Sequence, residues 1–144
     1  MMNNRTGKAW GLVVFVLALS MPSISYASDA ESIRKLSLVK AYVESLGAEC
    51  RGRASGKYLN RGQYYIVRTT LYRHNRYFIV GAGDSTVRDL DILLLDENEN
   101  EIDRDAGRDP SPIVEVSPRW SGTFYIAVLM YSGRGHSNIM ICYK

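Results

Sequence analysis

The sequence YFIVGAGDSTVRDLDILLLD, residues 77–96, decides the class of fold. Two short apolar runs, at 77–80 and 90–95, lie on either side of a segment that contains Gly, Asp, Ser and Thr. Runs of this length, bounded by turn-forming residues, are typical of β-strands. After Asp91 the second run is apolar at every position, which predicts a strand covered on both faces at the centre of a sheet.

The chain from Gln63 onward continues this pattern of short strands. Residues 64–71 alternate between two faces, and further runs at 113–116, 124–131 and 139–143 are bounded by Gly, Asp, Asn or Pro. Roughly six or seven short strands with no helix between them predict an antiparallel β-sandwich.

Length and composition limit the class of protein. The chain has 144 residues, 46% apolar and 23% charged, which suits one globular domain and excludes a disordered chain. Its two cysteines are too few for a disulfide-dense mini-protein or for a zinc module built on four cysteines. The net charge of +3 is too small to indicate nucleic acid as a partner. We expect the protein to be a monomer.

The first 27 residues have the pattern of a secretory signal peptide. Arg5 and Lys8 precede an apolar run at 9–21, and small residues at Ser25 and Ala27 predict cleavage after Ala27. The alternative is a membrane anchor, but the run is shorter than the ~20 residues that a spanning helix needs. We therefore expect a protein of the periplasm or the cell exterior, with no membrane span after cleavage.

Export changes the interpretation of Cys50 and Cys142. In an oxidising compartment the only two cysteines of a chain are expected to form a disulfide bond, here between the start of the domain and its last strand. Two buried thiols are the alternative.

Residues 29–46 predict one short helix before the sandwich. Ser28 and Glu31 form an S-x-x-E capping box, and Gly47 suits the position after the helix. The apolar residues predicted to share one face are Ile33, Leu36, Val39, Tyr42, Val43 and Leu46. The expected organisation is a signal peptide at 1–27, a helix and linker at 28–50, and a sandwich domain at 51–144.

The order of several motifs resembles a known family. They are YFIVGAGD (77–84), DLDILLLD (89–96), IDRD (102–105), DPSP (109–112) and SGTFYIAV (121–128). Together they resemble the bacterial pre-peptidase C-terminal domain, a jelly-roll-like β-sandwich appended to secreted proteases. Residues 129–135 look like the closing hairpin of the related collagen-binding domains of clostridial collagenases. The resemblance covers about Ser55 to Lys144 and implies an accessory module that binds a polymer or assists secretion.

The resemblance also indicates a binding strand. The collagen-binding relatives use alternating tyrosines on the penultimate strand, and the matching positions here are Leu129 and Tyr131, so collagen itself is not expected. Trp120 and Tyr125 are further candidates, because aromatic side chains on a sandwich face stack on sugars or pack on peptides. The prediction is a protein or cell-envelope polymer bound through a sandwich face; ordinary core and surface packing is the alternative.

Calcium is the one metal that the sequence suggests. Residues 96–101 partly imitate a calcium loop, but Glu101 and Gly107 occupy the positions where an EF-hand needs Gly and Glu. The calcium loop of the relatives corresponds to residues 60–63, which contain no acid. An irregular site remains possible, with a solvated acidic loop as the alternative; its ligands would be Asp84, Asp89, Asp91, Asp103 and Asp105. No other cofactor is expected.

No catalytic motif is present, and we predict that the protein is not an enzyme. His74 and His136 are both expected in polar turns, the first in a hairpin. An inhibitor of a hydrolase such as lysozyme is a further alternative. The segment at 54–58 loosely resembles the S-G-x-x-Y loop of lysozyme inhibitors, and the segment at 121–125 fits its spacing but also belongs to the sandwich pattern.

Charge is distributed unevenly along the chain. Residues 51–76 contain seven basic residues and no acid, whereas residues 84–109 contain ten acids and three arginines. The simplest expectation is that the two segments neutralise each other across the sandwich.

Overall fold

The computed structural model describes residues 28–144, so the predicted signal peptide lies outside the described residues. One helix precedes nine strands. In chain order the elements are α1 (Asp29–Ser45), β1 (Glu49–Cys50), β2 (Ser55–Leu59), β3 (Tyr64–Leu71), β4 (Tyr77–Gly83), β5 (Val87–Leu95), β6 (Glu101–Asp105), β7 (Ile113–Val116), β8 (Gly122–Gly133) and β9 (Gly135–Tyr143). Within this part of the chain no helix is long and apolar enough to cross a membrane.

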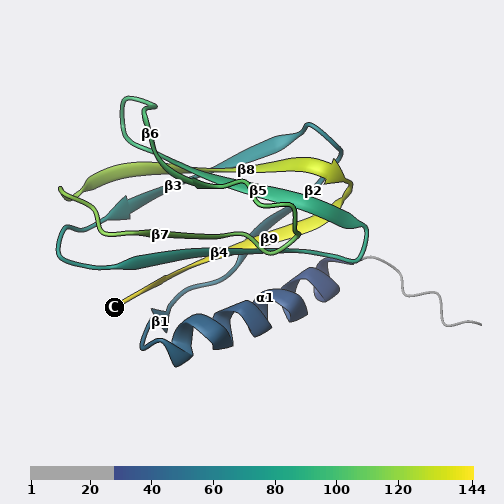
Figure 1. Cartoon of the computed structure of the whole chain (residues 1–144), viewed down its shortest axis with the longest axis horizontal. Coiled ribbons are helices and arrows are strands. Elements are labelled where there is room, and N and C mark those ends of the chain that lie inside the picture. The colour runs from purple at the N-terminus through teal and green to yellow at the C-terminus, as the bar shows by residue number, and fades with distance from the viewer. Residues whose placement is uncertain (1–27) are drawn as a thin grey trace, which may run out of the picture.

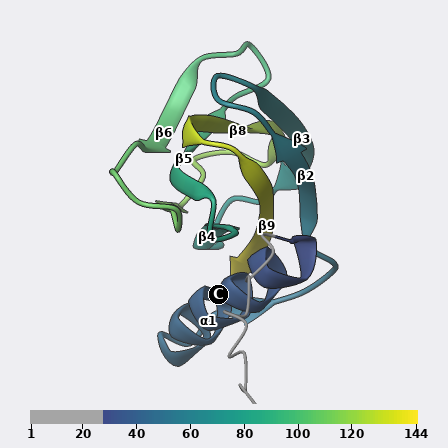
Figure 2. The ribbon, with the colours of Figure 1, turned by 90° about the vertical axis from the view of Figure 1, so that its right-hand side faces the viewer.

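Two antiparallel sheets form the predicted all-β sandwich (Figures 1 and 2). One sheet has the order β1-β9-β4-β7, with β2 also paired to β9, and the other has the order β3-β8-β5-β6. The helix α1 lies along the outer side of the first sheet, against β4 and β9 (Figure 1). We call the first sheet the helix-covered sheet and the second the open sheet.

The main core lies between the two sheets. β5 pairs with both β8 and β6, so the predicted central strand is confirmed. Leu90, Ile92 and Leu94 point inward and are fully buried, whereas Leu93 and Leu95 are half-buried on the outer side of the open sheet. The strand is apolar on both faces even though only one face meets the opposite sheet.

The helix begins and ends as the sequence predicts. The side chain of Ser28 accepts a hydrogen bond from the backbone N–H of Glu31 at 3.1 Å, and Gly47 adopts a φ of 89° after the last turn. The predicted apolar face is only partly right, because Ile33 and Tyr42 are exposed. A helix on a flat sheet buries a narrow stripe, which here consists of Ser32, Leu36, Val39 and Val43.

This stripe forms a second core with the outer side of the helix-covered sheet. Leu36 and Val43 are in a cluster with Phe78, Val80 and Ala82 of β4. One polar contact lies beside it: Asn138 Nδ2 donates to Ser32 Oγ at 2.6 Å and to Asp29 Oδ1 at 2.8 Å. These bonds satisfy the buried amide and hold the first turn of the helix on β9.

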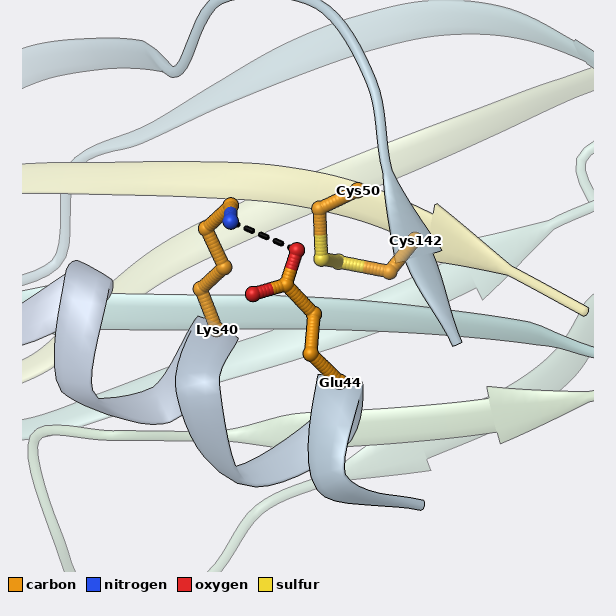
Figure 3. The surroundings of a disulfide bond; sticks show 4 residues. All are labelled: Lys40, Glu44, Cys50 and Cys142. Carbon is orange, nitrogen blue, oxygen red and sulfur yellow. Dashed lines mark hydrogen bonds and ion pairs between the residues drawn. A yellow bond between two sulfur atoms is a disulfide. The ribbon is translucent and has the colours of Figure 1, made fainter. Parts of the chain in front are cut away.

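The predicted disulfide joins Cys50 to Cys142, which are directly opposed on β1 and β9. Figure 3 shows the bond beside the last turns of α1, where Lys40 and Glu44 form an ion pair at 2.6 Å. Cys142 is fully buried in the second core. The bond therefore connects the linker after the helix to the last strand of the sheet that the helix covers.

Two connections differ from the sequence-based expectation. Residues 129–135 do not close a hairpin, because β8 belongs to the open sheet and β9 to the helix-covered sheet. Residues 73–76 likewise join strands of different sheets, β3 and β4. Turn-forming residues mark where a strand ends, but they do not say which sheet the next strand joins. His136 is also in a strand, β9, and not in a loop.

Candidate functional site

The outer face of the open sheet is apolar over much of its area. Residues that alternate with the core positions point away from the opposite sheet. We call this surface the open face; its residues are Tyr64, Ile66 and Arg68 of β3, Leu93 and Leu95 of β5, and Tyr125, Ala127, Leu129 and Tyr131 of β8. Tyr64 is 63% exposed, Ile66 53% and Tyr131 60%.

Strand register brings these residues into rows across the sheet. Ile66 lies opposite Ala127, which lies opposite Leu93. The next row runs from Arg68 through Tyr125 to Leu95. A shallow hollow of about 530 Å³ lies over these rows, lined by Tyr64, Ile66, Leu95, Glu99, Tyr125 and Ala127. Its floor is aliphatic and its sides carry two tyrosines, which suits the flat faces of sugars or an extended peptide.

The structure brings together three of the four predicted binding residues. Tyr125, Leu129 and Tyr131 all lie on the outward side of β8. Trp120 is elsewhere: its ring stacks on buried Phe124 at 5.4 Å between centroids, and its Nε1 donates to Glu97 Oε2 at 3.2 Å. Trp120 thus packs on the edge of the main core.

None of the other residues of the open face is predicted as a site residue from the sequence; they are Tyr64, Ile66, Arg68, Leu93, Leu95 and Ala127. Alternation alone predicts that one of Tyr64 and Tyr65 points outward, and the structure assigns that position to Tyr64. Tyr65 points inward, where its hydroxyl donates to the carbonyl oxygen of Ser55 at 3.2 Å and burial raises its pKa to about 12. The missing signal was the pairing of β3 with β8, which no local pattern specifies.

Asp84, the first predicted calcium ligand, is a buried carboxylate that holds two chain segments together. Its Oδ1 accepts hydrogen bonds from the N–H and the hydroxyl of Thr86, at 2.9 and 2.7 Å. Its Oδ2 accepts the N–H of His136 at 2.8 Å. Burial would raise the pKa of Asp84, but the hydrogen bonds from Thr86 and His136 outweigh it and hold the pKa below its ordinary value.

His136 lies beside this carboxylate. Its Nδ1 is buried and lies 3.5 Å from Asp84 Oδ2, and its ring meets the ring of Tyr58 edge-on at 5.1 Å. The ring is about one-third exposed. The sequence offered no sign of this pair, since the two residues are 52 positions apart.

Asp89 and Asp91 form a close carboxyl pair on β5. Alternation along the strand places both side chains on the same side, where they line a hollow of about 290 Å³ with Ala106, Arg108 and Tyr131. Asp89 Oδ1 is buried without a hydrogen-bond partner. Burial raises the pKa of Asp91, and the neighbouring charge of Asp89 raises it further.

The remaining predicted ligands bond to the backbone. Asp105 accepts the N–H groups of Gly107 at 3.0 Å and Ile113 at 2.8 Å, and Asp103 accepts the N–H of Arg104 at 2.8 Å. Across residues 28–144, no group of three or more His, Cys, Asp or Glu side chains is arranged to hold a metal ion. The calcium site stays a prediction.

The expected neutralisation between residues 51–76 and 84–109 does not occur through ion pairs. Among the described residues, Arg51 pairs with Glu49, Arg76 with Glu115 and Arg104 with Glu101. Glu49 and Glu115 lie outside the acidic segment, and Arg104 and Glu101 both lie inside it, so among the described residues no ion pair joins the basic segment to the acidic one.

Comparison with known proteins adds no assignment to this geometry. No protein-family model matches the chain, and no curated protein matches it.

Proposed function

We propose that this protein is an exported, non-catalytic binding module that holds a protein or a cell-envelope polymer on the open face. One observation carries the proposal: the two sheets both present apolar side chains outward, but only the helix-covered sheet has those side chains packed under α1. Exposed apolar surface costs free energy in water, so a contiguous patch of it marks an interaction surface.

The chemistry of the open face supports this class of ligand. Tyr64, Tyr125 and Tyr131 offer rings with a polar tip. The charged side chains of Asp89, Asp91 and Arg108 lie beside Tyr131, at one end of the face. Arg68 lies at one side of the apolar rows, and the Arg104–Glu101 pair lies at the other on β6. An apolar centre with a charged rim is the usual arrangement of a binding surface.

Two features support action outside the cytoplasm. The pattern of residues 1–27 is that of a signal peptide. The Cys50–Cys142 disulfide is of the kind that persists in oxidising compartments. The resemblance to pre-peptidase C-terminal domains agrees with both, since those domains accompany secreted enzymes.

The test compares a variant that lacks two tyrosine rings of the open face with a variant that lacks two similarly exposed rings elsewhere. The double variant Y64S/Y131S changes the open face, and the control Y42S/Y72S removes two tyrosines that are 57% and 58% exposed on α1 and in the β3–β4 connection. Binding is measured by co-sedimentation with purified peptidoglycan sacculi and by retention on immobilised gelatin, an extended polypeptide. We expect the unmodified protein and Y42S/Y72S to bind one of these probes and Y64S/Y131S to lose at least about tenfold in affinity. Equal binding by both double variants, or no binding of either probe by the unmodified protein, would contradict the proposal.

A further inference from the structure

A second hollow, separate in its chemistry from the open face, lies at the end of the sandwich where α1 begins. The β2–β3, β4–β5 and β8–β9 connections lie together there (Figure 1). They enclose a volume of about 530 Å³. Side chains that line it include Arg61, Arg88 and Arg134 and the hydroxyl residues Ser85, Thr86 and Ser132.

The three arginines have no carboxylate partner in the described part of the chain. The two acids that bond to lining residues of the hollow are already engaged. Asp84 bonds to Thr86 and His136, and Glu31 accepts the hydroxyl of Ser85 at 3.0 Å and pairs with Lys35 at 3.2 Å. Three positive charges therefore face one hollow without neutralisation, in a chain that has 15 acids.

Internal contacts fix the walls of this hollow. Thr86 donates its hydroxyl to the carbonyl oxygen of Arg134, and the N–H of Arg134 reaches the carbonyl oxygen of Thr86 at 3.4 Å. Gly133 has a φ of 87°, and a side chain there would overlap the carbonyl of Thr86 and the N–H of Arg88. On the third side, the N–H of Gly62 donates to the carbonyl oxygen of Met130 at 2.7 Å. The segments that carry the three arginines are thus attached to one another before any ligand arrives.

We propose that this hollow binds a phosphoryl group, as a phosphate monoester or diester. Guanidinium groups match the oxygens of phosphate in pairs, and the three arginines supply the donors here, because the hydroxyls of Ser85 and Thr86 already donate to internal acceptors. A phosphate monoester presents three acceptor oxygens and nearly two negative charges, which three arginines can share. A diester presents two free oxygens and one charge, so we expect the monoester to bind more tightly. The site goes beyond the proposed function, because it needs no contribution from the open face.

The experiment follows the arginine side-chain N–H signals of the disulfide-bonded protein by nuclear magnetic resonance during titration with inorganic phosphate at constant ionic strength. We expect saturable shifts at Arg61, Arg88 and Arg134. R88Q should weaken phosphate binding by about tenfold or more, since it removes a charge-assisted hydrogen bond. The control R73Q removes the same charge from an exposed position in the β3–β4 connection and should leave binding unchanged. R88K keeps the positive charge but lacks the paired donors of a guanidinium group. We expect its affinity for phosphate to lie between those of R88Q and R73Q.

Two further titrations distinguish the sources of the phosphoryl group. The first uses lipid vesicles. If the protein and R73Q bind vesicles of phosphatidylglycerol but not of phosphatidylcholine, and R88Q binds neither, the ligand is a lipid headgroup. Binding of glycerol 3-phosphate without vesicle binding would assign a soluble or polymer-linked phosphate. A linear, unsaturable response to phosphate, or the same loss in R73Q as in R88Q, would overturn the proposal, because only the net charge would then matter.

Discussion

The two sheets of the sandwich have similar strands and different surroundings. On the helix-covered sheet the outward residues Phe78, Val80 and Ala82 are buried under α1, and a disulfide joins that layer to the linker. On the open sheet the outward residues Tyr64, Ile66 and Tyr131 are in contact with solvent. Outward apolar residues therefore stabilise the fold on one side, whereas on the other they are available for a ligand. The following predictions test that difference.

The largest effect is expected from removing the disulfide. The bond closes a separation of 92 residues. In the chain-entropy model such a closure stabilises the folded state by about 4–5 kcal/mol. We expect the C50S/C142A variant to lose stability of this order in urea unfolding. An unchanged free energy of unfolding would show that the helix and its linker are held without the bond.

A matched pair of truncations compares the two outer faces directly. Leu36→Ala removes a side chain that is 1% exposed between α1 and β4, and we expect a loss of about 2–5 kcal/mol. Ile66→Ala removes a similar side chain from the open face, where we expect a change within about 0.5 kcal/mol. Urea unfolding of both variants gives the two values. Comparable losses would mean that the open face is part of the folded core.

Asp84 lies in the β4–β5 connection, where the chain passes from the helix-covered sheet to the open sheet, and its carboxylate stabilises that connection. In the variant Asp84→Asn, the amide NH₂ would face the backbone N–H of Thr86 or of His136, so one of these donors loses its acceptor. We expect the free energy of unfolding to fall by about 1–3 kcal/mol at neutral pH. Because the pKa of Asp84 is lowered by folding, its stabilisation is present above the unfolded pKa and is lost as the pH falls through the folded value. Thermal melts from pH 7 to pH 3 should decline less steeply in the variant. If the melting temperatures of the variant and of the unmodified protein declined in parallel with pH, this role of Asp84 would be contradicted.

Asp91 on the open sheet should have a smaller effect than Asp84, of opposite sign. Folding raises its pKa, so the native state binds more protons than the unfolded state between the ordinary Asp value and the raised one, and stability falls as the pH rises through that interval. Asp91→Asn removes the repulsion and offers Asp89 a donor. We expect a gain of about 1 kcal/mol at pH 7 and none at pH 3, measured by thermal melts. A loss at pH 7 would show that the Asp91 charge has a partner.

Local sequence patterns were sufficient for the helix, for six of the nine strands and for the disulfide, whereas β1, β2 and β6 are not among the predicted runs. The run at 90–95 predicted the central strand, Ser28 and Gly47 bounded the helix, and the two cysteines paired as an exported chain would require. These features depend on neighbours in sequence or on there being only one possible partner.

Features that depend on strand pairing could not be predicted in this way. The rows of the open face require the register of β3 on β8, and the turn at 129–135 gave no sign that the chain crosses to the other sheet. The arginine hollow unites Arg61 and Arg134 of the β2–β3 and β8–β9 connections with Arg88 at the start of β5. Their separate positions in the sequence indicate only exposed charges.

The central claim is that the open face, and not the covered one, meets the ligand. Hydroxyl-radical footprinting of the protein free and bound to peptidoglycan sacculi or gelatin tests it most directly, because tyrosines lie on both sides of the molecule. The account predicts protection of Tyr64, Tyr125 and Tyr131, with Tyr42 on α1 modified equally in both states. Protection of Tyr42 with unchanged modification of Tyr64 and Tyr131 would contradict it.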